Sequence, residues 1–414
     1  MGRNTSPRCA AISPTHEPAD CRQVSPYLSG IASCGARQYS QRMADFAPLD
    51  PAKLTGALEL LKNGVQQRAF PGAVLAVGRE GRLAIIPAGR LSYDAAAAPV
   101  SAETIYDLAS LTKVVATTAA AMILVDRGLL DINRPVAQYL PEFVPPYDIA
   151  EDPLWTVRSE VTIGHLLAHT SGLPGYEKFF LRAREKAHVL DEAMALPLEE
   201  PPGQKTVYSD VGFILLGGIL ERVASERLDI FCERDIFRPL SMRSTCFNPS
   251  RELWDRIAPT EQDDTFRKRV IHGDVQDENA WVMGGVAGHA GLFGTAADLA
   301  SFAQMMLRGG NTDARQLIQP ATIQEFTRAW PAQQGPARGL GWDKPSEPSS
   351  SGRHFSPASY GHLGYTGTSL WIDPEKQLFV ILLTNRIHPT RANEAIKAIR
   401  PAVHDAVVES LPHN

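Results

Sequence analysis

Residues 110–113 read Ser-Leu-Thr-Lys and stand between a short loop, residues 106–109, and a long apolar segment, residues 114–125. The pattern predicts a serine at the start of a helix. Because residues three apart share one helix face, the Ser110 hydroxyl and the Lys113 amine are expected to meet. A neighbouring amine can take the serine proton, and free backbone N–H groups of a first helical turn can stabilise an oxyanion. The stretch indicates a nucleophilic serine, although an exposed helix start with a solvated lysine also fits these four residues alone.

Length and composition restrict the class of protein. With 414 residues, 44% of them hydrophobic, the chain can form one large or two ordinary domains around a sizeable core. A net charge of -5, from 41 basic and 46 acidic residues, gives no basic surface for nucleic acid. The longest apolar runs, residues 114–125 and 213–220, are shorter than the roughly 20 residues that cross a bilayer, so no membrane span is expected. We expect a globular protein with a small-molecule or muropeptide substrate, and its oligomeric state stays open.

The first 48 residues are rich in Pro, Ser, Gly and Arg and have no periodicity, which predicts a disordered leader. They contain no apolar core of a secretory signal. Met43 is an alternative start, in which case the leader is not translated. Three of the five cysteines (Cys9, Cys21 and Cys34) lie in this leader, so no disulfide framework is expected. These features predict a cytoplasmic location, because a reducing compartment suits such cysteine usage.

Hydrophobic periodicity predicts strands near both ends of the chain and helices between them. The predicted strands are residues 73–77, 83–87, 367–372 and 378–384. The predicted helices are residues 51–65, 110–126, 162–169, 181–195, 211–224, 295–307 and 391–408. Residues 331–357, dense in Gln, Ser, Pro and Gly, are expected to form a surface loop. Strands at both ends around a helical middle predict one sheet completed by distant parts of the chain.

Two further motifs can supply groups to a site around Ser110. Tyr-Ser-Asp at 208–210 precedes an apolar helix and can present the Tyr208 hydroxyl; its alternative is a buried tyrosine followed by Asp210 as the helix N-cap. Gly-His-Leu-Gly-Tyr-Thr-Gly at 361–367 precedes the last two strands, and its glycines allow close approach of backbone and ligand. Its alternative is an ordinary turn with a surface histidine. The order and spacing of the three motifs together favour one common site.

With these motifs in this order, the sequence resembles the serine β-lactamase and penicillin-binding protein superfamily, especially its class C-like branch of β-lactamases, D-Ala peptidases, esterases and amidases. The resemblance covers residues 50 to 410, approximately. It rests on Ser-Leu-Thr-Lys at 110–113, on Tyr-Ser-Asp at 208–210, where the family often has Tyr-x-Asn, and on His-Leu-Gly at 362–364, where penicillin binders have Lys-Thr-Gly. It implies an α+β fold, in which helices flank an antiparallel β-sheet and an all-α lobe stands beside it.

The resemblance also implies a domain organisation and a set of roles. One catalytic domain would span residues 49–412, with an α/β lobe at about 49–120 and 290–412 and an all-α lobe at about 121–289. Ser110 would be the acylated nucleophile, Lys113 its proton partner and Tyr208 the general base or proton shuttle; which of the two takes the first proton stays open. The backbone N–H groups of Ser110 and Tyr365 would form the oxyanion hole, and the substrate would contact Asp210, His362, Gly364 and Tyr365.

Two departures from the family pattern bear on substrate choice. Asp210 replaces an amide and can only accept hydrogen bonds. Beside Lys113 it would hold that amine protonated, which weakens Lys113 as the base and favours Tyr208 in that role. His362 lacks the fixed charge of a lysine, so the pocket is expected to have no cation for a ligand carboxylate. We therefore expect β-lactams to be turned over poorly compared with small esters, and His362→Lys to narrow that gap.

Residues 273–280, followed by a Gly-rich run at 284–291, resemble a segment of the branch that includes cell-wall muramoyl-alanine amidases. In it Asp277, Glu278 and Asn279 either line the substrate cleft or brace loops. The sequence thus predicts a serine hydrolase that acts through an acyl-enzyme on an amide or ester, with peptidoglycan-derived peptides as the first substrate class and small esters as the second. A true class C-like β-lactamase and a catalytically silent binding protein with the same pocket are the alternatives.

Two other kinds of site, a zinc site and the nucleophile elbow of α/β-hydrolases, are not expected from the sequence. His165 and His169 are spaced as in helical zinc sites, but the glutamate of the metalloprotease signature is missing, so neither a metal nor a cofactor is expected. No Gly-x-Ser-x-Gly surrounds any serine of the chain, which excludes the nucleophile elbow of α/β-hydrolases.

Overall fold

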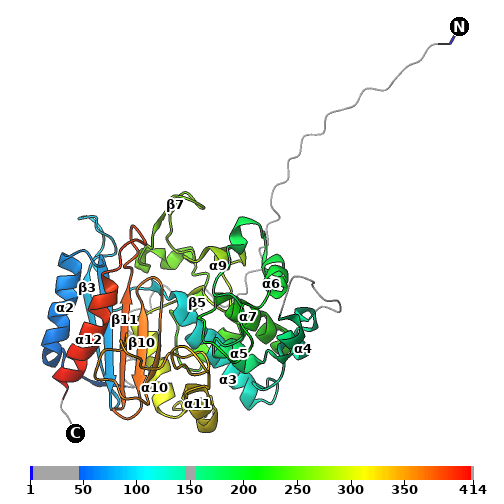
Figure 1. The fold of residues 1–414 in the computed structure, drawn as a ribbon. Coiled ribbons are helices and arrows are strands. Elements are labelled where there is room, and N and C mark those ends of the chain that lie inside the picture. Colours follow the sequence, from blue (N-terminus) through cyan, green and yellow to red (C-terminus); the bar gives the residue numbers. More distant parts are fainter. Residues whose placement is uncertain (3–45, 145–153, 412–414) are drawn as a thin grey trace. The chain divides into compact units, whose positions relative to one another are not determined.

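The computed structural model describes residues 1–2, 46–144 and 154–411, and the residues from Phe46 onward form one compact unit (Figure 1). The leader predicted for residues 1–48 lies almost wholly outside the described residues. The prediction was wrong for residues 46–48, because Phe46 is buried and Ala47–Pro48 forms a strand paired with Arg82 and Leu83. For the residues before them, disorder and the alternative start at Met43 remain predictions.

The centre of the unit is a six-stranded β-sheet with the strand order β1-β3-β2-β11-β10-β9. Its strands are β1 Ala47–Pro48, β2 Gly72–Arg79, β3 Arg82–Gly89, β9 Tyr360–Leu363, β10 Ser369–Asp373 and β11 Leu378–Thr384. All neighbours are antiparallel except β1 and β3, which run parallel. Because β2 pairs directly with β11, strands from both ends of the chain meet at the centre of the sheet. This confirms the predicted α+β fold with an antiparallel sheet.

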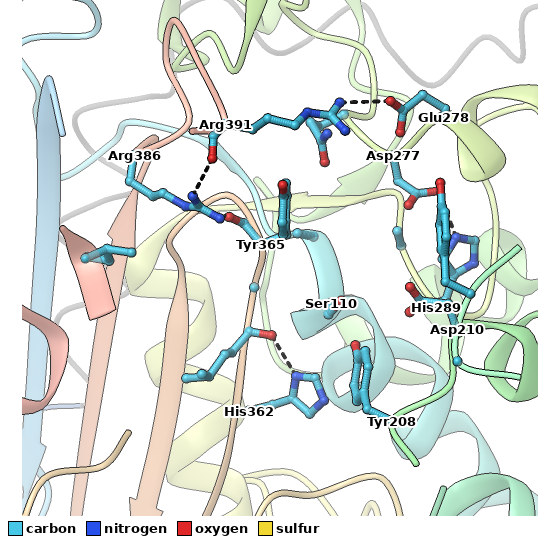
Figure 2. Close-up of a pocket in the computed structure, with 18 of the residues that line it drawn as sticks. Ser110, Tyr208, Asp210, Asp277, Glu278, His289, His362, Tyr365, Arg386 and Arg391 are labelled. Atoms are coloured by element: carbon cyan, nitrogen blue, oxygen red, sulfur yellow. Dashed lines mark hydrogen bonds and ion pairs between the residues drawn. The ribbon is translucent and has the colours of Figure 1, made fainter. Parts of the chain in front are cut away.

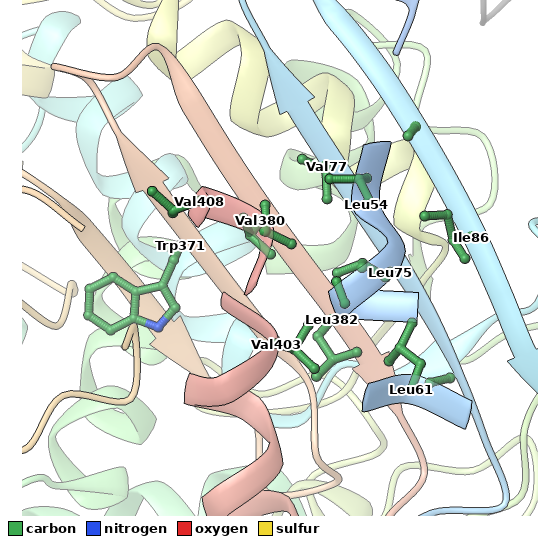
Figure 3. Packing of buried hydrophobic residues seen from close by; sticks show 14 of the residues in the cluster. Leu54, Leu61, Leu75, Val77, Ile86, Trp371, Val380, Leu382, Val403 and Val408 are labelled. Atoms are coloured by element: carbon green, nitrogen blue, oxygen red, sulfur yellow. The ribbon is translucent and has the colours of Figure 1, made fainter. Parts of the chain in front are cut away.

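Helices cover both faces of the sheet. On one face Leu75 and Val77 of β2 join a core with residues of α2 (Thr55–Gln66) and α12 (Ile396–Ser410), as Figure 3 shows. Side chains alternate along a strand, so Val74 and Ala76, which are also buried, face the opposite side. Helix α10 (Ala296–Leu307) contacts β2, β10 and β11 there. A strand covered on both faces needs apolar residues at every position, which explains the unbroken run in β2.

The rest of the unit is mainly helical and lies beside the sheet (Figure 1). Its helices are α3 Ala119–Asp126, α4 Val136–Tyr139, α5 Ile163–Leu167, α6 Lys186–Ala195, α7 Asp210–Ala224, α8 Leu228–Cys232, α9 Glu278–Val282 and α11 Pro320–Thr327. Short strands form two small sheets: β4 Tyr106–Asp107 with β8 Leu292–Gly294 and β5 Cys246–Phe247, and β6 Gln262–Asp263 with β7 Arg269–Val270. The segment predicted to be all-α, residues 121–289, is therefore mostly helical but contains β5, β6 and β7.

Several predicted boundaries were wrong. The third motif is not a turn before the last strands but contains an edge strand of its own, β9, paired with β10. The last helix begins at Ile396 rather than at residue 391. The helix predicted for residues 181–195 begins at Lys186, after a single 3-10 turn. In the predicted surface loop, residues 331–357, the Trp342 side chain is fully buried, because it packs against Tyr360 of β9.

One helical stretch, residues 109–126, is apolar and long enough to cross a membrane by length and composition. In this fold 83% of it is buried inside the protein, as in the core helix of a globular domain. Among the described ranges it is the one stretch that meets this test. The same stretch carries Ser110 and Lys113, so it positions the candidate site.

Candidate active site

The backbone around Ser110 is held in a strained turn. Ala109, directly before Ser110, has a positive φ of 47°, a left-handed conformation that costs a non-glycine residue roughly 1–2 kcal/mol. The Asp107 carboxylate stabilises this turn, since Oδ1 accepts a hydrogen bond from the Ala109 N–H at 2.8 Å and Oδ2 accepts one from the Gln276 N–H at 2.7 Å. Burial raises the pKa of Asp107 to about 6 despite these bonds. Ser110 then lies in a 3-10 turn, η3 (Ala109–Leu111), that leads into α3 through the π-helix η4 (Lys113–Thr118).

Lys113 connects three parts of the chain. Its Nζ donates to Ser110 Oγ at 3.1 Å, to Asp210 Oδ1 at 2.6 Å and to the His289 carbonyl oxygen at 3.0 Å. The side chain is 0% exposed. Burial alone lowers the pKa of Lys113, but the Asp210 carboxylate outweighs it, so the pKa lies above its usual value. The predicted meeting of Ser110 with Lys113, and of Lys113 with Asp210, is thus present in the geometry.

The second motif places Tyr208 against this pair. Ser209, not Asp210 as the alternative had it, is the N-cap of α7, because its Oγ accepts a hydrogen bond from the Gly212 N–H at 3.0 Å. The Asp210 carboxylate is therefore free to reach Lys113. The Tyr208 hydroxyl forms side-chain hydrogen bonds with Lys113 and Ser110, and burial, partly offset by Lys113, raises its pKa. The ring itself remains 39% exposed and forms a wall of the cavity.

His169 supports Tyr208 from behind. It lies past the end of α5, with a φ of +58°, and its Nδ1 accepts a hydrogen bond from the Ser209 N–H at 2.9 Å. Its ring lies 4.7 Å from the Tyr208 ring. The other histidine of the zinc-like pair, His165, caps the start of α5 instead. Within residues 46–144 and 154–411, no group of three or more His, Cys, Asp or Glu is placed to hold a metal ion.

The third motif faces Ser110 from strand β9. His362 is 2% exposed, and its Nδ1 bonds the Leu363 carbonyl oxygen at 2.8 Å, so Nδ1 carries the proton. Its Nε2 is buried and has no hydrogen-bond partner among the described residues. Burial lowers the pKa of His362 to about 4, and the imidazole is neutral near pH 7. His362 therefore offers an acceptor to the cavity in place of a lysine cation.

Gly364 brings this motif close to the nucleophile loop. A Cβ at Gly364 would lie 2.0 Å from Thr368 Oγ1 and 2.6 Å from the Leu108 carbonyl oxygen. Tyr365 follows directly and lines the cavity. In the described part of the chain, the backbone N–H groups of Ser110 and Tyr365 donate to no turn, loop or cap carbonyl, which leaves both groups available to an oxyanion.

A cavity of about 850 Å³ joins the three motifs (Figure 2). All seven predicted site residues except Lys113 line it; Lys113 lies directly beneath, under Ser110 and Asp210. The family model described as Beta-lactamase matches residues 58–404, most of the chain. The protein belongs to the β-lactamase family. This confirms the resemblance found in the sequence.

Relatives and solved structures of the β-lactamase family agree with this assignment. A Salmonella agona (strain SL483) protein named "Putative D-alanyl-D-alanine carboxypeptidase" is 36% identical over 316 residues, which are 71% of this chain and 72% of that protein. A penicillin-binding protein homologue from Caulobacter crescentus superposes with a TM-score of 0.68 at 21% identity, covering 88% of this chain and 99% of that one. EstCE1, described as a hydrolase with promiscuous acyltransferase activity, superposes with a TM-score of 0.65 at 22% identity, covering 85% of this chain and 99% of that one. The chain is thus a serine hydrolase of this family.

The β-lactamase-family site contains a carboxylate–histidine pair, of which the sequence predicted only the carboxylate, Asp277. Asp277 Oδ1 lies 2.8 Å from His289 Nε2, and the carbonyl oxygen of the same histidine accepts from Lys113. Burial tends to raise the pKa of Asp277, but the interaction with His289 outweighs it and brings the pKa to about 2. Asp277 and Glu278 line the cavity, whereas Asn279 braces a loop through bonds to Phe180 and Glu177. The glycine-rich run around His289 was the signal available in the sequence.

The cavity of this hydrolase also contains cations that the sequence did not suggest. Arg386, Arg391, Lys397 and Arg400 all line it, on the side of β11 and α12. The expectation that the cavity lacks a cation for a ligand carboxylate was therefore wrong. It assumed that such a charge comes from position 362, but these four side chains come from the last 29 residues of the chain.

Proposed function

We propose that this hydrolase cleaves an amide or ester bond in peptidoglycan-derived peptides through an acyl-enzyme on Ser110. The observation that carries the proposal is the contact of 3.1 Å between Lys113 Nζ and Ser110 Oγ at the floor of a cavity large enough for a short peptide. The carboxypeptidase name of the Salmonella relative supports this substrate class, and small esters are the second class.

In acylation the Ser110 oxygen would attack the substrate carbonyl carbon, and the resulting oxyanion would be bound by the backbone N–H groups of Ser110 and Tyr365. The serine proton passes to Lys113 in its neutral form. Tyr208 then donates its hydroxyl proton to the leaving nitrogen or oxygen as the carbonyl–heteroatom bond breaks, and takes the proton held by Lys113 in exchange, so both groups are neutral again. In deacylation water attacks the ester, and the proton it loses returns along the same groups to Ser110.

The two candidate bases differ in how they can act. The pKa of Tyr208 is raised by burial, so its hydroxyl is protonated near pH 7 and suits a proton shuttle. The pKa of Lys113 is also raised, because Asp210 outweighs burial, so the resting amine is mainly charged. We propose Lys113 as the first base, acting through its minor neutral form, since it is held directly on Ser110.

A fluorophosphonate probe tests the nucleophile. Incubation of the full chain should add one phosphonyl group to Ser110, located by peptide mass spectrometry, and Ser110→Ala should remain unlabelled. Labelling of Lys113→Ala should be slower by several orders of magnitude, because nucleophile and base act as a unit. Ester hydrolysis by Ser110→Ala at a rate near the wild type would refute the mechanism, and an unlabelled wild type would favour a silent binding protein.

Substrate class is tested by comparing kcat/KM for three sets of compounds. We expect muropeptides and short p-nitrophenyl esters to be hydrolysed. Benzylpenicillin and cephalosporins should be hydrolysed poorly, because Asp210 cannot donate a hydrogen bond to their acyl side-chain carbonyl as an amide would. Efficient cephalosporin hydrolysis with esters ignored would make the protein a true β-lactamase.

The cytoplasm is the compartment that we propose, since Cys232 and Cys246 are both free thiols in the described part of the chain.

A further inference from the structure

We propose that Arg386 and Arg400 form a carboxylate-binding subsite in the cavity, which would bind the free carboxylate of a peptide substrate. The inference deepens the proposed function and rests on it. It starts from the fact that the cavity contains two buried guanidinium groups without a carboxylate partner.

Arg400, on α12, is the more deeply buried of the two, at 5% exposure. Its Nη2 donates a long hydrogen bond to the Thr368 carbonyl oxygen at 3.3 Å, and its Nε has no partner among the described residues. No ion pair joins it to an Asp or Glu in the described ranges. Burial lowers the pKa of Arg400 to about 10, with a further contribution from the charge of Arg386. The guanidinium is still charged near pH 7 and retains free donors.

Arg386 follows β11 and is 7% exposed. Its Nε donates to the Tyr365 carbonyl oxygen at 2.9 Å, and its Nη1 donates to the carbonyl oxygens of Arg391 and Asn393. These partners are neutral backbone groups, so they satisfy donors without forming an ion pair. The carboxylates of Glu394 and Glu261 act on the Arg386 charge only through space, and burial still lowers its pKa. A buried charge normally has an ionic partner, because desolvation is otherwise expensive.

Three further cations line the cavity, Lys178, Arg391 and Lys397, and the last two are already neutralised. Arg391 is ion-paired with both Glu261 and Glu278, and Lys397 with Glu394 at 2.6 Å. The acidic groups nearest to Arg386 are thus engaged by other residues. An external carboxylate is the partner that would balance the remaining guanidinium charge, and two guanidinium groups suit its two oxygens.

The position of the subsite fits a substrate that also reaches Ser110. Arg386 bonds Tyr365, whose N–H is proposed for the oxyanion hole, and its guanidinium lies 4.7 Å from the Tyr365 ring. Arg400 bonds the carbonyl of Thr368, whose hydroxyl donates to the Leu108 carbonyl, two residues before the nucleophile. In Figure 2, Arg386 and Tyr365 lie on the opposite side of Ser110 from Tyr208. A peptide whose reactive carbonyl is on Ser110 would place a nearby carboxylate here.

The first experiment measures turnover of a thioester with a carboxylate on its leaving group, benzoylglycyl thioglycolate, and of its methyl ester. The wild type should prefer the acid by about tenfold or more in kcat/KM, as expected for a charge-assisted hydrogen bond. Arg400→Gln and Arg386→Gln should each abolish most of this preference while the methyl ester is still hydrolysed. An unchanged acid-to-ester ratio in both variants would overturn the proposal.

A matched control removes one charge from the same cavity. In Arg391→Gln the acid-to-ester ratio should stay as in the wild type, because the Arg391 charge is already paired with Glu261 and Glu278. Melting temperatures separate binding from folding. Arg400→Gln should not melt at a lower temperature than the wild type without ligand, since it removes an unpaired buried charge.

A binding measurement tests the subsite in the absence of turnover. Calorimetric titration of Ser110→Ala with N-acetyl-D-alanyl-D-alanine should give at least about tenfold tighter binding than its C-terminal amide. Adding Arg400→Gln should remove the difference. Equal affinities, or no binding of either compound, would overturn the subsite. If the acid binds more tightly than the amide but the wild type hydrolyses neither thioester, the subsite stands and the proposed function fails. If both thioesters are hydrolysed at the same rate, the proposed function stands and the subsite fails.

Discussion

The carboxylate at position 210 keeps the pKa of the neighbouring Lys113 above its usual value. Asp210 Oδ1 lies 2.6 Å from Lys113 Nζ, and this attraction exceeds the effect of burial on the pKa of Lys113. An amide at the same place would donate to the substrate and leave the amine easier to deprotonate. The protein therefore maintains a stable, paired lysine, and a smaller fraction of Lys113 is neutral at a given pH.

Asp210→Asn tests this coupling. Loss of the carboxylate should lower the pKa of Lys113, so a larger neutral fraction exists at low pH and the acidic limb of the activity profile moves toward lower pH. The rate of fluorophosphonate labelling of Ser110, measured between pH 5 and 9 in about half-unit steps, reports this directly. An acidic limb that does not move, with slower labelling at every pH, would contradict the prediction and give Asp210 a direct proton-accepting role.

The structure changes the expectation for His362→Lys. A lysine there would be buried at a place that already faces the charges of Lys113 and Arg338, which help to lower the pKa of His362. We expect a lower melting temperature and no gain in the acid preference, because the unpaired cations lie at Arg386 and Arg400. Calorimetric melting and the thioester ratio measure both effects. A variant with wild-type stability and an acid preference raised more than about tenfold would restore position 362 as the carboxylate site.

Hydrogen bonds hold residues 364–368, which follow β9, against the turn that precedes Ser110. After β9, Thr366 Oγ1 donates to the Asp107 carbonyl oxygen at 2.8 Å and Thr368 Oγ1 donates to the Leu108 carbonyl oxygen at 3.1 Å. Gly364 permits this approach because it has no side chain. The position of Tyr365 relative to Ser110 thus depends on hydrogen bonds between segments more than 250 residues apart.

Gly364→Ala should separate the two elements. The new Cβ would lie 2.0 Å from Thr368 Oγ1 and 2.6 Å from the Leu108 carbonyl oxygen, so the β9 loop must shift. We expect kcat/KM for a p-nitrophenyl ester to fall about 100-fold or more, as when an oxyanion donor is lost, with a destabilisation of about 1–3 kcal/mol. In the control Gly56→Ala the Cβ meets only Ala406, at 3.6 Å, and both quantities should be kept. Wild-type activity of Gly364→Ala would show that the loop tolerates the shift.

Local spacing explains what could be predicted from the sequence. Ser110 and Lys113 meet because they are three residues apart on one helical stretch, and the paired strands β2, β3, β10 and β11 have apolar runs separated by turn residues. The edge strand β9 was missed because its Tyr-Gly-His-Leu has only one strongly apolar position, with Gly361 inside the strand and Gly364 directly after it. Its strand conformation comes from pairing with β10, which no local pattern shows.

The charges of the site could not be predicted because they depend on distant partners. His289 contacts Lys113 across 176 residues of sequence, and Arg391 contacts Glu261 across 130. Arg386 and Arg391 have the same residue type and lie five positions apart, yet only Arg391 has carboxylate partners. That difference, which decides which cation can bind a ligand, exists only in the folded protein.

Segments from the two ends of the compact unit pack and pair with each other. The N-terminal α2 packs on the C-terminal α12 over the sheet, and β2 pairs with β11. Upstream of α2, β1 adds to the sheet edge: the Ala47 and Leu49 N–H groups donate to carbonyl oxygens of the β3 hairpin at 3.0 Å, and Phe46 is buried against Phe379. Phe46, three residues after Met43, is therefore already part of the folded unit.

Two truncations test where the folded unit begins. A protein that starts at Met43 keeps Phe46, β1 and Leu49, so its melting temperature and ester hydrolysis should equal those of the full chain. A protein that starts at Pro51 loses two buried apolar side chains, each worth about 2–5 kcal/mol, and the edge strand. Its melting temperature should fall by several degrees. Equal stability of the two truncations would show that β1 contributes nothing, whereas a large loss already in the protein starting at Met43 would show that the leader packs on the fold.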